Sequence, residues 1–219
     1  SDRSSGEDRL ARRREFGFQA EDFVIGLCSG LRPVKAHGDL LAALVKLRSR
    51  GVAAKVLLIG DGPERQAIER AITRLGLEGH VAITGFHEDV RSLVSACDVM
   101  TLVSHSETFS LAALESMALG KPLVMSAVGG AGEQVIHGEH GFLFPPGDID
   151  ALAARLEDLT SAALRSRLGN AATRRVRELF TVRYMADRFT DSMHRLLHSC
   201  RAPAPPSAAR CGHDEVAGR

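Results

Sequence analysis

Two glutamates, Glu107 and Glu115, are placed where a carboxylate could bind or act on a ligand. Glu107 lies in the polar segment after an apolar strand-like run. In α/β proteins, ligands bind at such segments. Glu115 lies within a mostly apolar run, residues 111–119, which predicts a helix packed on all sides. A buried carboxylate is costly unless it accepts hydrogen bonds. We therefore expect Glu115 to accept bonds from ligand hydroxyls or, as the alternative, to pair with a buried Arg or Lys.

The start of the helix that carries Glu115 is suited to an anion. The first backbone N–H groups of a helix have no helical partner, and they favour a phosphate. Here these groups belong to Phe109, Ser110 and Leu111. The alternative is an ordinary helix start without a ligand.

A second group of residues suited to an anion follows the first strand-like run. Arg32 and Lys35 lie close behind Gly30. A guanidinium fork and an ammonium point charge beside a glycine suit a diphosphate. Solvated surface charge is the alternative.

The elements that must position these residues alternate regularly along the chain. Apolar strand-like runs are followed by helical patterns, which is typical of βαβ units. The sequence therefore predicts an α/β fold, a Rossmann-like parallel sheet with helices on both faces. Strands are expected at residues 23–28, 56–59, 81–83, 99–103, 123–125 and 142–144, and helices from about 40 to 50, from Pro63, at 90–94, 111–119, 149–159, 162–179 and 182–198.

Several motifs, in this order, resemble those of family 4 glycosyltransferases, which have the GT-B fold. Glu107 and Glu115 have the E-x7-E spacing of that family. The resemblance covers roughly residues 22–198. It is carried by residues 30–35, 58–63, 81–85, 104–120, 129–133 and 141–145.

The resemblance implies that the chain is the donor-binding half of a retaining enzyme. Such an enzyme transfers a sugar from a nucleotide diphosphate sugar, without a metal or other cofactor. Glu107 would face the donor sugar as the catalytic residue, Glu115 would bind the ribose, and the base would lie near residues 83–86. The donor-binding residues implied are Gly30, Arg32, Lys35, Ile83, Thr108, Phe109, Ser110, Leu111 and Glu115.

The sequence departs from the family pattern at two positions. Gly30 stands where the family has an arginine, and we expect Arg32 to substitute for it from two residues further on. Ser104-His105 replaces the usual Pro-Ser, so the family implies no role for His105.

The resemblance also predicts the domain organisation. Residues 1–21 are expected to lead in from a missing N-terminal acceptor-binding domain, residues 22–198 to form the nucleotide-sugar-binding domain, and residues 199–219 to be a disordered tail. Alone, the chain is expected to bind donor and transfer little. The last helix should expose Met185, Phe189 or Met193 toward the acceptor domain.

Composition narrows the class of partner. The formal net charge is +1, with one Tyr and no Trp, which argues against a nucleic-acid binder. Cys28 and Cys97 lie in apolar runs and are expected to be buried free thiols. No apolar run reaches about 18 residues, the length of a membrane span. These features favour a cytoplasmic location, with peripheral contact at the inner membrane face as a further option.

Other functions remain as alternatives. The chain could be a stand-alone nucleotide-sugar-binding module without catalysis, or a sugar-nucleotide epimerase that shares the GT-B fold. A dinucleotide fingerprint at Gly60 and Gly62 fails, because Arg65 replaces its third glycine. Asp148 is better explained as a helix cap than as part of a metal motif. His194, His198 and Cys200 are better explained as solvated surface than as zinc ligands.

Overall fold

The computed structural model describes residues 2–199, and it describes side chains from residue 6 to residue 197. The chain divides into two compact units, Ser1–Thr181 and Val182–Arg219. This division falls before the last helix, and the expected domain bounds stay a prediction. The expected disordered tail and the Cys200 position lie outside the described residues.

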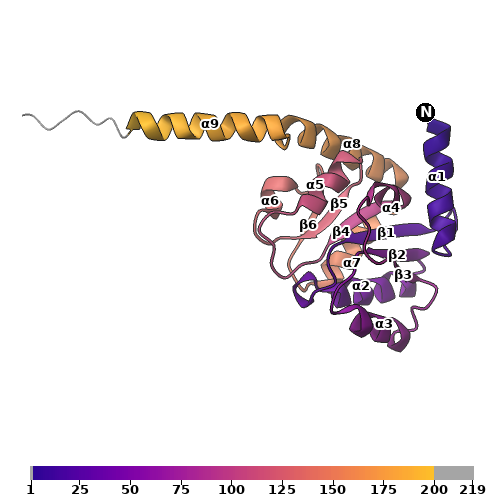
Figure 1. The fold of residues 1–219 in the computed structure, drawn as a ribbon. Helices are drawn as coiled ribbons and strands as arrows, with labels where there is room; N and C mark the ends of the chain where they lie inside the picture. The colour runs from indigo at the N-terminus through magenta and orange to yellow at the C-terminus, as the bar shows by residue number, and fades with distance from the viewer. Residues whose placement is uncertain (1, 200–219) are drawn as a thin grey trace, which may run out of the picture. The chain divides into compact units, whose positions relative to one another are not determined.

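A six-stranded parallel sheet in the order β3-β2-β1-β4-β5-β6 forms the centre of the first unit (Figure 1). The order reverses between β1 and β4, which are neighbours although the strands β2 and β3 separate them in sequence. At such a switch point, loops from adjacent strands leave the sheet in opposite directions and open a crevice. The strands are β1 (Phe23–Cys28), β2 (Ala54–Ile59), β3 (Val81–Ile83), β4 (Val99–Leu102), β5 (Leu123–Ser126) and β6 (Gly141–Phe144).

Helices cover both faces of this sheet. α2, α3 and α7 pack on one face through one apolar cluster, and α4, α5, α6 and α8 pack on the other through a second cluster. The predicted Rossmann-like class is confirmed. The helices are α1 (Asp2–Glu15), α2 (His37–Ser49), α3 (Arg65–Arg74), α4 (Arg91–Ala96), α5 (Leu111–Ala118), α6 (Ala131–Gln134), α7 (Ile149–Asp158), α8 (Ala162–Leu179) and α9 (Val182–Ser199), with a 3-10 turn at Pro33–Lys35.

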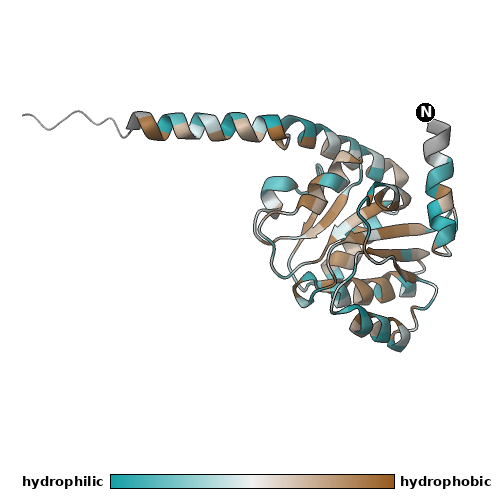
Figure 2. Ribbon diagram, viewed as in Figure 1, coloured by the Kyte–Doolittle hydropathy of each residue, from teal (hydrophilic) through white to brown (hydrophobic). Residues whose placement is uncertain are grey.

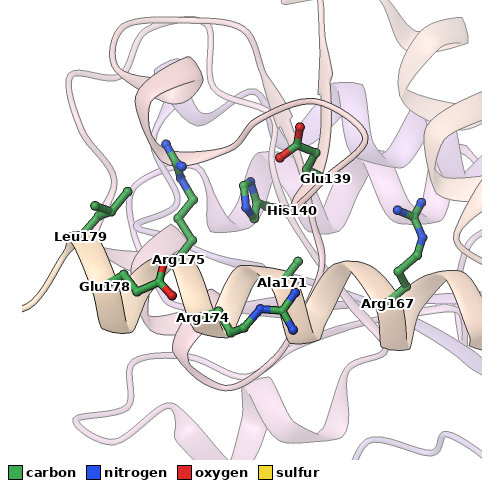
Figure 3. A pocket seen from close by; sticks show the side chains of 8 residues that line it. All are labelled: Glu139, His140, Arg167, Ala171, Arg174, Arg175, Glu178 and Leu179. Carbon is green, nitrogen blue, oxygen red and sulfur yellow. The ribbon is translucent and has the colours of Figure 1, made fainter.

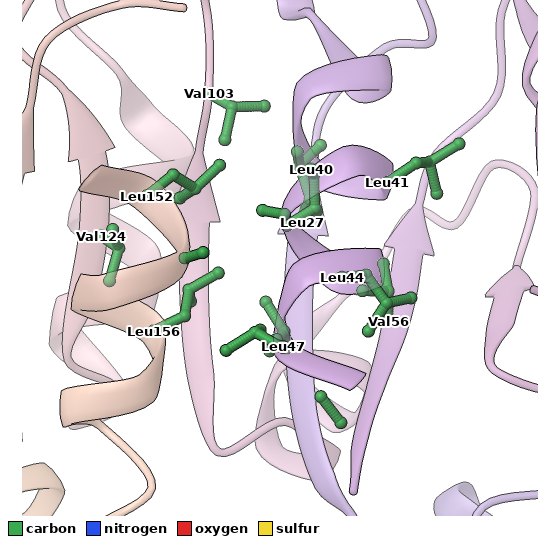
Figure 4. Close-up of a cluster of buried hydrophobic side chains, with 14 of the residues drawn as sticks. Leu27, Leu40, Leu41, Leu44, Leu47, Val56, Val103, Val124, Leu152 and Leu156 are labelled. Atoms are coloured by element: carbon green, nitrogen blue, oxygen red, sulfur yellow. The ribbon is translucent and has the colours of Figure 1, made fainter. Parts of the chain in front are cut away.

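Strands buried on both faces explain the continuous apolar runs of the sequence. In Figure 2 the strands are mostly brown, the colour of hydrophobic residues. Figure 4 shows the cluster between α2, α7 and the sheet, where Leu40, Leu44 and Leu47 meet Leu152 and Leu156. All five of these leucines are fully buried. This packing fixes the carboxyl ends of β1 and β4, from which the candidate site loops leave.

Two features of the first unit differ from the sequence prediction. α3 begins at Arg65 rather than at Pro63, because the Glu64 N–H donates to the Leu31 carbonyl oxygen at 3.0 Å and holds the preceding turn against the loop after β1. Pro63 therefore belongs to the turn. The α1 helix was not predicted, because its sequence is polar and charged.

Arg13 fastens α1 to the rest of the first unit. It is 1% exposed, and its guanidinium donates to the carbonyl oxygens of Ala96, Ala20 and Asp22. It also pairs with Asp98 at 2.7 Å. Arg13 and the turn that follows α1 therefore pack on this unit, whereas the expected origin of residues 1–21 in a lead-in from an acceptor domain stays a prediction.

The α9 helix carries large apolar side chains that are exposed, including Met185, Phe189 and Met193. They are the residues expected to face a partner domain, and that partner stays a prediction. Across the described residues, no helix has the length and apolar character that crossing a membrane requires.

Candidate functional site

The loops after β1 and β4 are tied together at the switch point. Lys35 Nζ donates to Glu107 Oε2 in an ion pair whose side chains are 22% and 21% exposed. The His105 N–H donates to the Val34 carbonyl oxygen at 2.9 Å, and His105 Nε2 lies 2.9 Å from Asp39 Oδ2. The structure therefore brings together two of the expected site residues, Lys35 and Glu107, from segments 72 residues apart.

Close backbone packing supports the loop after β1. The Leu31 N–H donates to the Asp61 carbonyl oxygen at 3.0 Å. A Cβ atom added at Gly60 or Gly62 would collide with the backbone of Ser29 or Leu31. Gly60 and Gly62 thus serve to let two loop backbones touch, a role different from that in a dinucleotide fingerprint.

The loop that carries Glu107 is supported in the same way by the turn after β5. A Cβ atom at Gly129 would overlap the Glu107 carbonyl oxygen, and Gly129 has φ +50°. The Gly130 N–H donates to the Thr108 carbonyl oxygen at 2.8 Å. Glycines at these two positions therefore fix the path of the loop.

The start of α5 is capped and partly free. Ser110 is the N-cap, and its hydroxyl accepts from the Ala113 N–H at 3.3 Å. Within the described residues, no hydrogen bond uses the N–H groups of Phe109, Leu111 or Ala112. These groups can still bind an anion.

The expectation that the Ser110 N–H is free is wrong. It donates to Gln134 Oε1 at 3.2 Å, and Gln134 Nε2 returns a bond to the Ser110 carbonyl oxygen at 2.8 Å. Sequence analysis missed Gln134, which is fully buried. The sequence signal for it is weak, a polar side chain four residues after the Gly129–Gly130 turn.

The expectation that the α5 helix is packed on all sides is also wrong. Glu115 is exposed, and Leu111 is 71% exposed. The reason is that only one side of α5 faces the sheet, where Ala113 and Met117 are buried. Across residues 6–197, no ion pair engages Glu115, so pairing with a buried cation does not explain it.

Glu115 instead lines a cavity of about 420 Å³ together with the segment before α4. Glu88, Asp89, Val90 and Arg91 lie on its other side, and Ala118 and Leu119 complete it. Sequence analysis expected the base near residues 83–86, and it did not name Asp89, Arg91, Ala118 or Leu119 as site residues. Burial, and then the charge of Glu115, raise the pKa of Cys28 to about 11.

Ile83 does not join this cavity. In β3 the side chains alternate between the faces, and Ile83 packs with Val81 against the core cluster under α2 and α3. Ala82 faces the opposite cluster. The exposed aromatic near this strand end is Phe86, at 77%.

Arg32 lies beside the glycine that replaces the family arginine. A Cβ atom at Gly30 would sit 3.8 Å from Arg32 Nε and 4.0 Å from its Cγ. The Arg32 side chain is exposed and therefore runs through the space next to position 30. A guanidinium is present in this region despite the glycine.

A buried histidine begins α2 behind this loop. His37 is 3% exposed, and its Nε2 lies 3.3 Å from Ser29 Oγ. Burial, and then the charge of Lys35, lower its pKa to about 4, so the ring is neutral at pH 7. Neutral His37 leaves Lys35 and Arg32 as the cations of this loop.

A second hollow, of about 340 Å³, lies along α8 and away from the switch point (Figure 3). Arg167, Arg174 and Arg175 line it with His140 and two glutamates. In Figure 3 Arg167 and Arg175 extend from different turns of α8 and do not converge on one point. In residues 6–197, no cluster of His, Cys, Asp and Glu has the arrangement of a metal site.

Known proteins are similar to this chain in sequence. The family described as "Glycosyl transferases group 1" matches residues 8–175. The N-acetyl-alpha-D-glucosaminyl L-malate synthase of Bacillus anthracis is 33% identical over 174 residues, which are 79% of this chain and 45% of that enzyme. The D-inositol 3-phosphate glycosyltransferase of Stackebrandtia nassauensis is 33% identical over 178 residues, 75% of this chain and 40% of that enzyme.

Solved structures agree with these sequence relatives. HepE of Anabaena in complex with UDP superposes with a TM-score of 0.79 at 30% identity, over 86% of this chain and 53% of HepE. HepE has also been solved in complex with UDP-glucose. The C-terminal domain of a group 1 glycosyl transferase from Francisella tularensis has a TM-score of 0.70 at 22% identity, over 80% of this chain and 93% of that domain, a likeness of fold. The chain spans about half the length of the full enzymes it matches.

Proposed function

This chain belongs to the group 1 glycosyltransferases, and we propose that it is the donor-binding half of a retaining enzyme of that family. In this proposal, a nucleotide diphosphate sugar binds at the carboxyl edge of the sheet, across the switch point between β1 and β4. An N-terminal domain would bind the acceptor. The enzyme would be located in the cytoplasm and would contact the inner face of the membrane.

We base the proposal on the ion pair between Lys35 and Glu107, which joins the two loops beside free N–H groups at the start of α5. We call this region, residues 29–37 and 104–112, the phosphate end. A diphosphate there would meet Lys35, Arg32 and the N–H groups of Phe109 and Leu111. Positive charge aimed at the leaving diphosphate stabilises the charge that develops as the sugar departs, without requiring a metal.

Glu107 is positioned for the sugar side of the same reaction. Its side chain is partly exposed and is oriented by Lys35. A carboxylate at this place would contact the donor sugar or stabilise positive charge that develops on it. Thr108 and Ser110 would support the loop rather than contact the donor directly. The Thr108 carbonyl oxygen accepts from the Gly130 N–H, and Ser110 is buried with its N–H and C=O both bonded to Gln134.

The nucleoside would occupy the second part of the site, residues 84–91 and 115–119, which we call the nucleoside end. Glu115 lines the cavity there and can accept hydrogen bonds from two neighbouring ribose hydroxyls. We propose UDP as the nucleotide, since HepE was solved in complex with UDP and with UDP-glucose.

The second candidate is a nucleotide-sugar-binding module without catalysis. Gly30 favours it, because a glycine at the position of the family arginine removes one cation from the loop. An assay of sugar transfer, made on a protein that joins this chain to an acceptor domain, distinguishes the two functions. The enzyme predicts transfer. The module predicts binding with no transfer.

Calorimetric titration with UDP, GDP and ADP in the presence of a chelator tests the proposal. We expect saturable binding of UDP and weaker or no binding of the other two. Glu115→Ala should lose UDP binding, whereas Glu78→Ala, at an exposed turn outside the cavity, should keep it. Absence of binding by all three nucleotides would contradict a donor site formed by this chain.

A further inference from the structure

Arg175 on α8 reaches the start of α5 through the end of α6. Its Nε donates to the Gln134 carbonyl oxygen at 2.9 Å, and its Nη2 donates to the Glu133 carbonyl oxygen at 2.7 Å. The Gln134 side chain in turn makes the two bonds to the backbone of Ser110. Arg175 therefore holds the residue that holds the N-cap of α5.

A second route from Arg175 runs through two aromatic rings. The guanidinium carbon lies 5.7 Å from the ring centroid of Phe180, within the range of a cation–π contact. The Phe180 ring lies 5.8 Å from the Phe109 ring, with 58° between their planes. Phe109 directly precedes Ser110, so both routes end on adjacent residues of the phosphate end.

The hydrogen bonds of Arg175 and of Gln134 each stabilise a part of this region. α6 has four residues and cannot be stable by itself, so a cation on its last carbonyl groups supports its C-terminal end. Gln134 is fully buried, and it satisfies both the N–H and the C=O of Ser110. If Gln134 shifted, those groups would be left buried and unpaired, which is costly.

We propose that Arg175 is a positioning residue for donor binding, and that it sets the phosphate-binding start of α5 through Gln134 and Phe180. The inference rests on the proposed function. Arg175 lines the hollow along α8 and extends from that helix beside His140 (Figure 3), so its effect on the donor is indirect.

The test compares Arg175→Met with Arg174→Met, which removes the same charge from the adjacent, exposed position of α8. UDP and uridine are titrated into each variant of the full chain. Arg175→Met should weaken UDP binding about fivefold to tenfold, the effect of one lost hydrogen bond of good strength, and leave uridine binding unchanged. Arg174→Met should match the wild type for both ligands. Equal UDP affinity in the wild type and Arg175→Met would overturn the proposal.

A measurement without nucleotide keeps this test apart from the proposed function. Hydrogen exchange of the Ser110 amide should become faster in Arg175→Met and stay slow in Arg174→Met. Arg175→Lys should also exchange faster, because one ammonium cannot reproduce the fork across two carbonyl groups. Slow exchange in both Arg175 variants would overturn the positioning role. A third outcome is that Ser110 exchanges faster in Arg175→Met than in the wild type, but the wild type does not bind UDP. That outcome would contradict the proposed function and leave the positioning role of Arg175 intact.

Phe180→Leu offers a milder variant in case Arg175→Met does not fold. It removes the ring contacts with Phe109 and Arg175 and leaves both hydrogen bonds of Arg175 to α6. UDP binding should weaken about twofold to threefold, a loss typical of one aromatic contact, with uridine again unaffected. Equal losses for UDP and uridine would mean that the variant disturbs the fold generally, and would overturn this second route.

Discussion

The phosphate end and the nucleoside end of the candidate site are held in different ways. At the phosphate end, Lys35 pairs with Glu107 and Ser110 is bonded twice to buried Gln134. At the nucleoside end, Glu115 is exposed and engaged in no ion pair of the described residues, and Asp89 pairs with Arg91 at the surface. In the first region the side chains are paired with one another or with the backbone, whereas the second region depends on exposed side chains. We therefore expect diphosphate binding to depend on the fixed loops after β1 and β4, and the choice of base to depend on the exposed segment at residues 84–91.

The largest expected effect lies at the nucleoside end. Glu115→Ala should weaken UDP binding about 100-fold, because a carboxylate that accepts two hydroxyl bonds is lost. The unfolding free energy should stay within about 0.5 kcal/mol of wild type, since the side chain is exposed. Calorimetry and urea unfolding check the two parts. A variant that binds UDP as well as the wild type would refute the ribose assignment.

Burial of His37 at the phosphate end should make the free energy of unfolding depend on pH. The pKa of His37 is about 4 in the folded chain and 6.5 ordinarily, so the unfolded chain binds more protons between these values. Stability is full above about pH 6.5 and falls as the pH drops toward 4. Between pH 7 and pH 5 the loss should be about 2 kcal/mol.

Urea unfolding at both pH values measures this loss. His37→Gln should reduce the pH dependence, whereas His194→Gln, an exposed histidine of α9, should leave it unchanged. An identical pH dependence in His37→Gln and the wild type would show that the ring of His37 is not held neutral.

Removing the charge of Lys35 should weaken binding of the diphosphate more than binding of the nucleoside. Lys35→Met should lower UDP affinity about tenfold, the loss of one charge-assisted contact, and should leave uridine affinity unchanged. The difference should shrink at high salt if part of it is long-range attraction. Lys46→Met on α2 serves as the control. Equal losses for UDP and uridine would mean that the two ends are not separate.

The smallest effect should come from Arg32. Arg32→Ala should weaken UDP binding about threefold, because its exposed side chain is solvated before and after binding. Arg70→Ala, another exposed arginine, provides the comparison. If Arg32→Ala were as harmful as Lys35→Met, Arg32 would replace the family arginine fully rather than in part.

The elements with strong local patterns could be predicted from the sequence. β1, β3 and α8 have the predicted bounds, because buried parallel strands and amphipathic helices leave strong patterns. Asp148 caps α7 as expected, accepting from the Ala151 N–H at 2.9 Å. Cys28 and Cys97 are free thiols, and Cys97 is buried.

The errors concern contacts between elements that no local pattern encodes. The apolar composition of α5 suggested burial around Glu115, yet the helix covers the sheet with one side only. Ile83 stays a predicted donor-binding residue, although it is partly buried and packs against the core cluster. Gln134 and Arg13 are buried polar residues that bond to residues far away in the sequence. No local pattern of the sequence indicates their burial or their hydrogen bonds.

The most direct measurement of the two-part site is the change in backbone amide chemical shifts when UDP or uridine is added to the isotope-labelled chain. Both ligands should shift residues 88–91 and 115–119, and UDP alone should also shift Phe109, Leu111 and Ala112. Shifts confined to other parts of the chain, such as the hollow along α8, would contradict the proposed site. The same would hold if UDP and uridine shifted one identical set of amides.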